Sequence, residues 1–354
     1  MRIAQVAPLT ESCPPKLYGG TERVVAYLTE ELVRAGHEVT LFASGDSQTS
    51  ARLVPCCRRA LRLDPVKESA LAHHMIMLNR VRERAAEFDL VHVHLDYLHF
   101  PVFAARGIPV LTTQHGRLDV PGLAAVFDEF KDLPMVSISD AQRLPVPTAS
   151  WLATVHHGLP RERFRLAGGE GGYLAFIGRI SPEKRPDRAI AIARRVGMPL
   201  RIAAKIDDAD RAYFERTVAP LLDDPLVEFI GEIGEAEKQA FIGEASALLF
   251  PIDWPEPFGL VMIEAMACGT PTIAFRCGSV EEIIEDGRSG WIVDSVAEAV
   301  AAVPRALALE RATVRASFEA RFTAEQMTRA YLALYRALIA APRVAIPREL
   351  EVAR

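Results

Sequence analysis

The chain has 354 residues, half of them hydrophobic and a quarter charged, which is typical of a soluble globular protein of two domains. Its net charge of -5 argues against a general nucleic-acid binder, and no apolar run is long enough for a transmembrane segment. The N-terminus lacks a signal-peptide pattern, and five cysteines without metal-type spacing favour a reducing cytoplasm over a disulfide framework (Cys13, Cys56, Cys57, Cys268 and Cys277).

The first half of the chain alternates strand and helix patterns. A buried strand over 2–8 leads through a Pro- and Gly-rich loop into a helix over 21–38, capped by Thr21 and stopped by Gly36. A strand over 39–44 completes a βαβ unit, which predicts a parallel sheet. The alternation continues with a helix near 68–86, strands over 89–95 and 108–116, a short strand running into a helix over 134–143, and a strand over 152–159.

A second cycle of strands and helices begins with the strand, loop and helix of residues 171–197. The Gly- and Arg-rich stretch over 156–172 marks the change between the two halves. Strands separated by helices then follow over 198–206, 227–233, 246–252, 270–275 and 290–294. The fold class is therefore α/β, with two Rossmann-like, doubly wound parallel sheets, and a ligand is expected at the carboxyl ends of the strands, in the cleft between the domains.

The stretch "DWPEPFGLVMIEAMACGTPTIAF", residues 253–275, contains two carboxylates in an apolar setting. Gly259 and Gly269 bound a helix over about 259–268 that is apolar on nearly all sides, and Glu264 is its only charged residue. A buried carboxylate needs a donor from a ligand or from the protein. A nucleotide with its diphosphate at the helix start and its ribose near Glu264 would supply one, and an internal Arg would serve equally well.

Two cations follow the strand at the start of the second half. Arg179 and Lys184 in "FIGRISPEKRPDRAI" flank a turn before a helix, where an Arg fork and a Lys point charge can bind a phosphate. A solvated basic loop is the alternative. Gly19 and Gly20 precede the first helix and allow close approach of the backbone to a phosphate or a sugar. They do not form a GxGxxG motif, so a dehydrogenase is disfavoured.

Histidines mark the first domain's side of the expected cleft. His115 ends a strand in "TTQHG" and is the expected active-site residue. His94 and Asp96 are expected on the acceptor side. His92, His94 and His115 could instead bind a metal, but alternating histidines in a strand are more often packing groups, so no metal is expected.

In order along the chain, these motifs resemble retaining glycosyltransferases of the GT-B fold, and most of all glycosyltransferase family 4. "EPFGLVMIE" resembles the family's Glu, seven residues, Glu motif, and "GRISPEK" resembles its Arg/Lys diphosphate motif. "YGGTERVV", "DLVHVHLD" and "TQHG" are similar to its N-terminal signatures, and "AMACGTPTIAF" and "GSVEEIIEDGRSGWIV" to its closing segments. The resemblance spans residues 1 to about 340.

The resemblance implies a role for each motif residue. Arg179 and Lys184 would bind the donor diphosphate, Glu264 the ribose hydroxyls, and His115 would lie beside the transferred sugar. The donor side would further comprise Gly19 and Gly20 near the phosphates, and Glu256 with the backbone amides of Phe258, Gly259 and Leu260 at the sugar. The implied domains are 1–160 for the acceptor and 161–325 for the donor, with a helix over 326–340 crossing back to the first domain and a tail over 341–354.

The implied activity is that of a hexosyltransferase, with His115, Glu256, Arg179 and Lys184 as catalytic candidates. It would transfer a sugar, with retention, from a UDP- or GDP-sugar to an unknown acceptor hydroxyl, without cofactor or metal. A nucleotide-sugar epimerase of the same architecture, a non-catalytic nucleotide-sugar binding protein and a phosphorylase-like enzyme are the alternatives. The basic segment 56–63 could contact an anionic acceptor or a membrane surface, but we expect it to be a solvated helix face.

Overall fold

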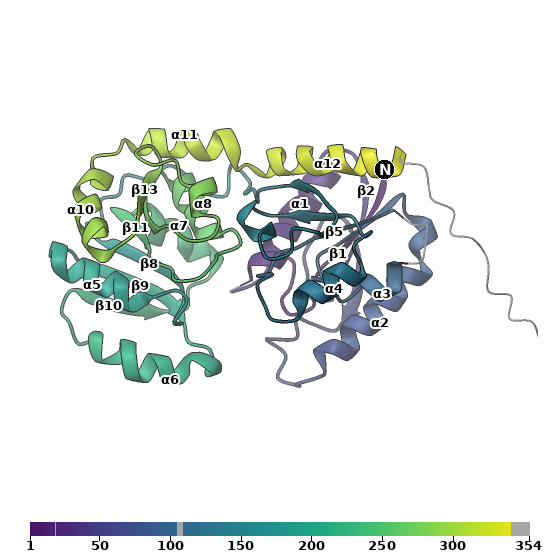
Figure 1. Cartoon of the computed structure of the whole chain (residues 1–354), viewed down its shortest axis with the longest axis horizontal. Coiled ribbons are helices and arrows are strands. Elements are labelled where there is room, and N and C mark those ends of the chain that lie inside the picture. Colours follow the sequence, from purple (N-terminus) through teal and green to yellow (C-terminus); the bar gives the residue numbers. More distant parts are fainter. Residues whose placement is uncertain (18, 105–108, 341–354) are drawn as a thin grey trace, which may run out of the picture.

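The computed structural model of the chain describes residues 1–17, 19–104 and 109–340, so the expected tail over 341–354 lies outside it. Two parallel β-sheets, each covered by helices on both faces, form two domains (Figure 1). The strands of the first sheet follow the order β3-β2-β1-β4-β5-β6-β7 and those of the second follow β10-β9-β8-β11-β12-β13. Both sheets are doubly wound, as the sequence predicts.

The first domain contains the strands β1 (Arg2–Val6), β2 (Glu38–Ser44), β3 (Arg52–Cys57), β4 (Leu90–Val93), β5 (Val110–Thr113), β6 (Met135–Ser137) and β7 (Trp151–Thr154). Its helices are α1 (Gly20–Arg34), α2 (Ala70–Glu83), α3 (Phe100–Phe103) and α4 (Leu123–Glu129). The second domain contains β8 (Leu174–Arg179), β9 (Leu200–Lys205), β10 (Val227–Gly231), β11 (Ala247–Phe250), β12 (Thr272–Phe275) and β13 (Gly290–Val293). Its helices are α5 (Pro186–Val196), α6 (Arg211–Tyr213, continued by a π-helical turn over Phe214–Val218), α7 (Glu235–Gly243), α8 (Leu260–Cys268), α9 (Val280–Ile283), α10 (Val296–Leu307) and α11 (Arg311–Arg321), and the last helix is α12 (Ala324–Ala340).

The apolar strands form the core because both faces of each sheet are buried. Successive side chains of a strand point to opposite faces, so Ile3 of β1 packs towards α1 and α12, whereas Ala4 packs towards α2. Ile3 is aligned with Val39 of β2 and Leu90 of β4. The chain order of the strands reverses between β1 and β4 and again between β8 and β11, which are the two points where such sheets bind ligands.

The last helix, α12, belongs spatially to the first domain although it follows the second in sequence (Figure 1). Its Tyr331 and Tyr335 are fully buried against the first sheet in one cluster with Ile3 and Leu28. The chain crosses between the domains twice, and the two crossings are hydrogen-bonded side by side. The amide of Leu159 donates to the carbonyl of Phe322 over 2.9 Å, and the amide of Ala324 donates to the carbonyl of Leu159 over 2.8 Å.

The prediction that residues 56–63 form a solvated helix face is wrong. Cys56 and Cys57 end strand β3, and turns follow. Pro55 lies within this strand, which is tolerated because β3 is at the edge of the sheet. The basic side chains of the segment are paired with acids: Arg58 contacts Asp64 over 3.1 Å.

Replacement of Gly158 by Ala should destabilise the double crossing. A Cβ at Gly158 would lie 2.3 Å from the carbonyl oxygen of Thr323, closer than real contacts allow. Overpacking of this kind costs about 1–3 kcal/mol. Gly178→Ala is the control, because nothing lies within 4 Å of a Cβ at that position. Thermal unfolding should show a lower midpoint temperature for Gly158→Ala than for Gly178→Ala. Equal midpoints would contradict the close packing of Gly158 against Thr323.

Candidate functional site

A cleft of about 580 Å³ lies between the domains, at the carboxyl ends of the central strands. The first domain lines it from the loops after β1, β3, β5 and β7 and from the start of α1. The second domain lines it from β8, β9 and the segment 254–264. All the donor-side residues that the sequence singles out line this cleft: Gly19, Gly20, Arg179, Lys184, Glu256, Phe258, Gly259, Leu260 and Glu264.

Helix α8 points its N-terminus into the cleft. Gly259 precedes it at φ 78, a left-handed conformation, and a Cβ there would lie 2.7 Å from the Met262 side chain. No side chain caps this end. The amide of Met262 donates to the carbonyl of Gly259 over 3.0 Å, whereas those of Leu260 and Val261 have no intrahelical acceptor and carry partial positive charge, so the start of α8 can bind an anion.

Glu256 is held in a rigid loop that leads into α8. A Cβ at Gly278 would lie 2.4 Å from both the backbone N and O of Glu256, so this close approach requires glycine. Ser279 donates its amide to the carbonyl of Glu256 over 3.0 Å and its hydroxyl to the carbonyl of Phe258 over 2.9 Å. The loop therefore presents the Glu256 carboxylate to the cleft at a defined position.

Lys184 forms an ion pair with Glu256 on the cleft wall. The indole N–H of Trp254 donates to the same carboxylate oxygen over 3.1 Å, and the ammonium of Lys184 lies 4.9 Å from the Trp254 ring. Arg179, at the end of β8, contacts Glu183 over 2.9 Å and Asp210 over 3.3 Å. Both cations are thus ion-paired with carboxylates of the second domain and are in position to meet a phosphate in the cleft.

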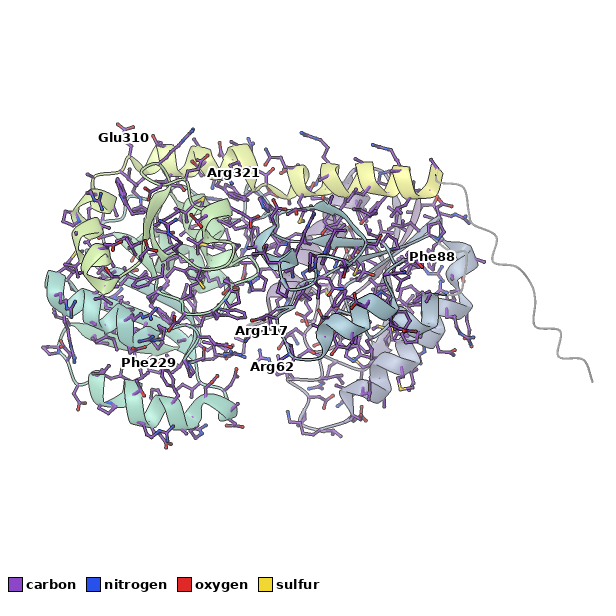
Figure 2. The ribbon with its side chains drawn as sticks, viewed as in Figure 1. Arg62, Phe88, Arg117, Phe229, Glu310 and Arg321 are labelled. Atoms are coloured by element: carbon purple, nitrogen blue, oxygen red, sulfur yellow. The ribbon has the colours of Figure 1, made fainter. Side chains whose placement is uncertain are left out.

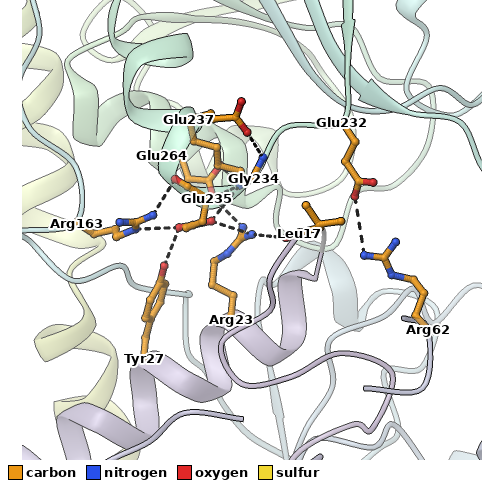
Figure 3. A network of polar contacts seen from close by, with 11 residues as sticks. Leu17, Arg23, Tyr27, Arg62, Arg163, Glu232, Gly234, Glu235, Glu237 and Glu264 are labelled. Carbon is orange, nitrogen blue, oxygen red and sulfur yellow. Dashed lines mark hydrogen bonds and ion pairs between the residues drawn. The ribbon is translucent and has the colours of Figure 1, made fainter. Parts of the chain in front are cut away.

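Glu264 is buried, with 1% of its side chain exposed, and is paired with two cations. Arg23 of α1 lies beside it (Figure 3) and donates to its Oε1 over 3.1 Å. Lys238 of α7 donates to Oε1 over 2.8 Å and to Oε2 over 3.0 Å. The alternative of an internal Arg is therefore realised, and this Arg comes from the other domain. Burial lowers the pKa of Lys238 from its usual range, and Glu264 partly offsets the effect.

Arg23 and Glu264 are part of a polar network that joins the two domains (Figure 3). Glu235 of α7 contacts Arg23 over 2.9 Å and Arg163 over 3.1 Å, and it accepts a hydrogen bond from the Tyr27 hydroxyl over 3.1 Å. Burial alone would raise the pKa of Glu235, but Arg23 and Lys238 keep it below the usual range. No signal in the sequence marks Lys238, Arg23 or Glu235, because each lies on a helix with an ordinary pattern.

The Gly19–Gly20 loop faces α8 across the cleft. A Cβ at Gly20 would lie 3.4 Å from the Leu260 side chain, and a Cβ at Gly19 would lie 2.8 Å from Cβ of Pro15. The absence of side chains here keeps the loop backbone close to the start of α8. A ligand bound at that helix end would therefore contact both domains.

His115 lines the cleft, as expected, whereas His94 lies behind it. His94 Nδ1 and His115 Nε2 are 2.8 Å apart. Asp96 is exposed and is not among the residues that line the cleft. His157 also lines the cleft and stacks on His115 with ring centroids 5.2 Å apart.

The buried histidines are bonded to protein groups rather than arranged around a common centre. His92 contacts Tyr335 and Thr113, each over 2.7 Å, and His94 contacts Gln5 over 2.9 Å. Within residues 1–17, 19–104 and 109–340, no group of three His, Cys, Asp or Glu side chains is placed to hold a metal ion. The same described part of the chain contains no helix that is long and apolar enough to cross a membrane.

The wall of the cleft that the first domain forms carries both signs of charge. Arg62 pairs with Glu11 and Arg117 pairs with Glu183 across the cleft, and both arginines lie where the domains meet (Figure 2). Glu22, at the start of α1, is buried, and burial raises its pKa to about 7. Its carboxylate accepts the backbone amide of Glu11 over 3.2 Å, which ties the cleft loop to α1.

Comparison with known proteins shows what the chain is similar to. Residues 18–196 match the family model described as Glycosyltransferase Family 4, and residues 161–321 match that of Glycosyl transferases group 1. A D-inositol 3-phosphate glycosyltransferase of Streptomyces scabiei is 28% identical over 267 residues, which are 62% of this chain and 60% of that protein.

Solved structures share the two-domain architecture. AviGT4, a glycosyltransferase involved in avilamycin A biosynthesis, has a TM-score of 0.70 and 25% identity, over 96% of this chain and 98% of that one. HepE of Anabaena in complex with UDP and glucose has a TM-score of 0.74 and 17% identity, over 95% of this chain and 100% of that one. These likenesses confirm the GT-B fold that the motifs predict.

Replacement of Arg23 by Met should destabilise the protein strongly. Arg23 is 6% exposed, and its loss would remove one of the cations that contact both Glu264 and Glu235. Breaking a buried pair costs about 3–5 kcal/mol, and because Lys238 remains on Glu264 we expect about 3 kcal/mol. The control is Lys16→Met, whose side chain is 62% exposed beside Asp46, where a pair contributes about 0–1 kcal/mol. Urea unfolding measures both, and equal losses would contradict a stabilising role of the network.

Proposed function

The chain belongs to glycosyltransferase family 4, and we propose that it is a retaining glycosyltransferase. It transfers a sugar from a nucleoside diphosphate sugar to an acceptor hydroxyl, without a metal ion. The observation that carries the proposal is the clustering of Lys184, Arg179, Glu256 and the α8 N-terminus on one wall of the interdomain cleft. Two cations and free amides suit a diphosphate, and the adjacent carboxylate suits sugar hydroxyls.

The leaving diphosphate gains negative charge as its bond to the sugar breaks. Arg179, Lys184 and the first amides of α8 are positive groups that are already placed where this charge develops, so they stabilise the transition state more than the ground state. Before the donor binds, Glu256 neutralises Lys184. Arrival of the diphosphate gives Lys184 a second anion and leaves Glu256 able to accept hydrogen bonds from the sugar.

Glu264 is proposed to bind the ribose. A carboxylate has about four lone-pair sites, and three are used by the hydrogen bonds from Arg23 and Lys238. One site therefore remains for a ribose hydroxyl without any rearrangement, and a second hydroxyl would have to displace Arg23. Because Arg23 belongs to the first domain, ribose binding and domain contact share this carboxylate.

The substrates are proposed from related proteins. HepE binds UDP, which makes UDP-sugars the first donors to test, and GDP-sugars the second. The name of the Streptomyces relative makes inositol 3-phosphate one acceptor to test. Thermal shift with UDP, GDP, ADP and TDP identifies the base, because a ligand that binds the native state stabilises it by mass action.

Incubation with the matching nucleotide sugar then tests the reaction. Transfer to an acceptor, or slow release of nucleoside diphosphate, would support a transferase. Accumulation of an epimer of the donor sugar would contradict it.

Lys184→Ala should lower turnover about 100-fold or more, by analogy with the loss of one preorganised donor at a developing charge. Release of nucleoside diphosphate by the purified variant measures the effect. Lys131→Ala is the control, because Lys131 is exposed and lies outside the cleft. Normal turnover by Lys184→Ala would contradict the diphosphate assignment.

Removal of divalent metal should leave the rate of transfer unchanged. The proposed positive charge comes from Arg179, Lys184 and the α8 amides, so no Mg²⁺ bridge to the diphosphate is required. Initial rates are compared after dialysis against EDTA and after addition of Mg²⁺ or Mn²⁺. A rate that is lost with EDTA and restored by metal would overturn the metal-independent part of the proposal.

A further inference from the structure

A chain of buried hydrogen bonds runs from helix α12 to the cleft. The Gln5 amide nitrogen donates to the Tyr335 hydroxyl over 3.1 Å, and the Gln5 carbonyl oxygen lies 2.9 Å from His94 Nε2. His94 Nδ1 lies 2.8 Å from His115 Nε2. At the other end, the Tyr335 hydroxyl contacts His92 Nδ1 over 2.7 Å. Gln5 and Tyr335 are fully buried, so water does not compete for these bonds.

With the Gln5 amide nitrogen on Tyr335 and its carbonyl oxygen facing His94, the position of each following proton is fixed in turn. An amide oxygen can only accept, so His94 Nε2 must carry the proton that Gln5 accepts. A neutral imidazole has a single N–H, which makes His94 Nδ1 an acceptor and requires His115 Nε2 to donate to it. Burial lowers the pKa of His115 to about 3 and that of His94 well below its usual value, so both rings are neutral. His115 Nδ1 is then left with a lone pair.

His115 Nδ1 has no hydrogen-bond partner among residues 1–17, 19–104 and 109–340, although this atom is buried and belongs to a residue of the cleft wall. A buried polar atom without a partner costs free energy unless a ligand or water supplies one. The ring of His157 stacks on His115 with an interplanar angle of 20° and restricts its rotation. His115 therefore has one unused acceptor atom beside the cleft.

We propose that Gln5, His94 and Tyr335 are positioning residues that fix His115 in the Nε2–H tautomer, so that its Nδ1 can accept but not donate a hydrogen bond in the cleft. Tyr335 orients the Gln5 amide, Gln5 orients the His94 proton, and His94 orients that of His115. The C-terminal helix thereby sets the hydrogen-bonding polarity of the cleft wall although it contributes no residue to that wall.

The fixed tautomer selects the substrate group that meets His115, and this part of the inference rests on the proposed function. A sugar hydroxyl can donate a hydrogen bond to His115 Nδ1. A carboxylate, an ester carbonyl or a phosphate oxygen has no proton to donate, so both this oxygen and Nδ1 would be left without a donor. His115 thus favours sugars with a free hydroxyl at this position over oxidised or acylated analogues.

The tautomer can be measured on the protein without any substrate. Long-range 1H–15N correlation spectra of protein labelled with 15N-histidine distinguish a protonated ring nitrogen from one with a lone pair. We expect His115 to show a protonated Nε2 and an unprotonated Nδ1 throughout the neutral pH range. A protonated Nδ1 on His115 would overturn the proposal.

A matched pair of substitutions tests the chain itself. Tyr335→Phe removes the acceptor that orients Gln5, so the Gln5 amide can turn over and His115 should become a mixture of tautomers. Tyr331→Phe is the control: Tyr331 is as buried on the same helix, and its hydroxyl, 2.9 Å from Thr113, is linked to Tyr335 through Thr113 and His92, so its loss leaves the acceptor of the Gln5 amide in place. Its spectrum at His115 should not change. Gln5→Leu is a second variant that breaks the link directly and should give the same mixture as Tyr335→Phe.

Kinetics separate the two parts of the inference. If only one tautomer is competent, kcat/KM should fall in proportion to its remaining population, about 2- to 10-fold in Tyr335→Phe and Gln5→Leu, with no fall in Tyr331→Phe. An unchanged His115 spectrum in Tyr335→Phe and Gln5→Leu would refute the positioning chain. The expected spectra in a protein that turns over no nucleotide sugar would support the chain and refute the proposed function.

Discussion

The buried carboxylate of Glu264 is the constraint on which the arrangement of the two domains depends. A charge with 1% exposure is tolerated only if cations neutralise it, and these come from both sides of the cleft, Arg23 from α1 and Lys238 from α7. Arg23 also contacts Glu235. The same residues that stabilise the pairing of the domains therefore line the proposed donor site, and ligand binding and domain contact are linked through one carboxylate.

A second constraint comes from the backbone. The two crossings between the domains are hydrogen-bonded side by side, and Gly158 allows them to approach. Helix α12 then packs its tyrosines against the first sheet, where Gln5 and His92 have their hydroxyl partners. The last described segment of the chain is thus part of the core behind His115, so the interior of the first domain is incomplete without a helix that follows the second.

Much of this was predictable from local pattern. Alternation of apolar strands with amphipathic helices predicts two doubly wound sheets, because parallel strands need crossover helices and both sheet faces are buried. The glycines at 259 and 269 predict the ends of α8. Glu256 and Glu264 lie in one segment of the second domain, and Arg179 lies at the end of one of its strands. The carboxyl ends of parallel strands meet at one edge of a sheet, so these residues are expected on one wall.

The partners of those residues were not predictable. Lys238 and Arg23 lie on helices whose patterns are ordinary, and strand β3 is obscured by Pro55 and its charged neighbours. His94 was expected to line the acceptor side, but it lies one layer behind His115. The strand pattern shows that alternate residues share a face, yet it does not show what packs on that face.

Local pattern alone predicts most of the elements, the two parallel sheets and the residue types at the cleft, because these follow from periodicity, from glycine and from the cost of burying charge. Only the tertiary structure decided which cations neutralise Glu264, that Glu256 pairs with Lys184, and that a hydrogen-bonded chain from Tyr335 reaches His115. The reason is physical: these contacts join residues that are 21 to 330 positions apart, and their geometry is set by packing across sheets and domains rather than by any local preference of the chain.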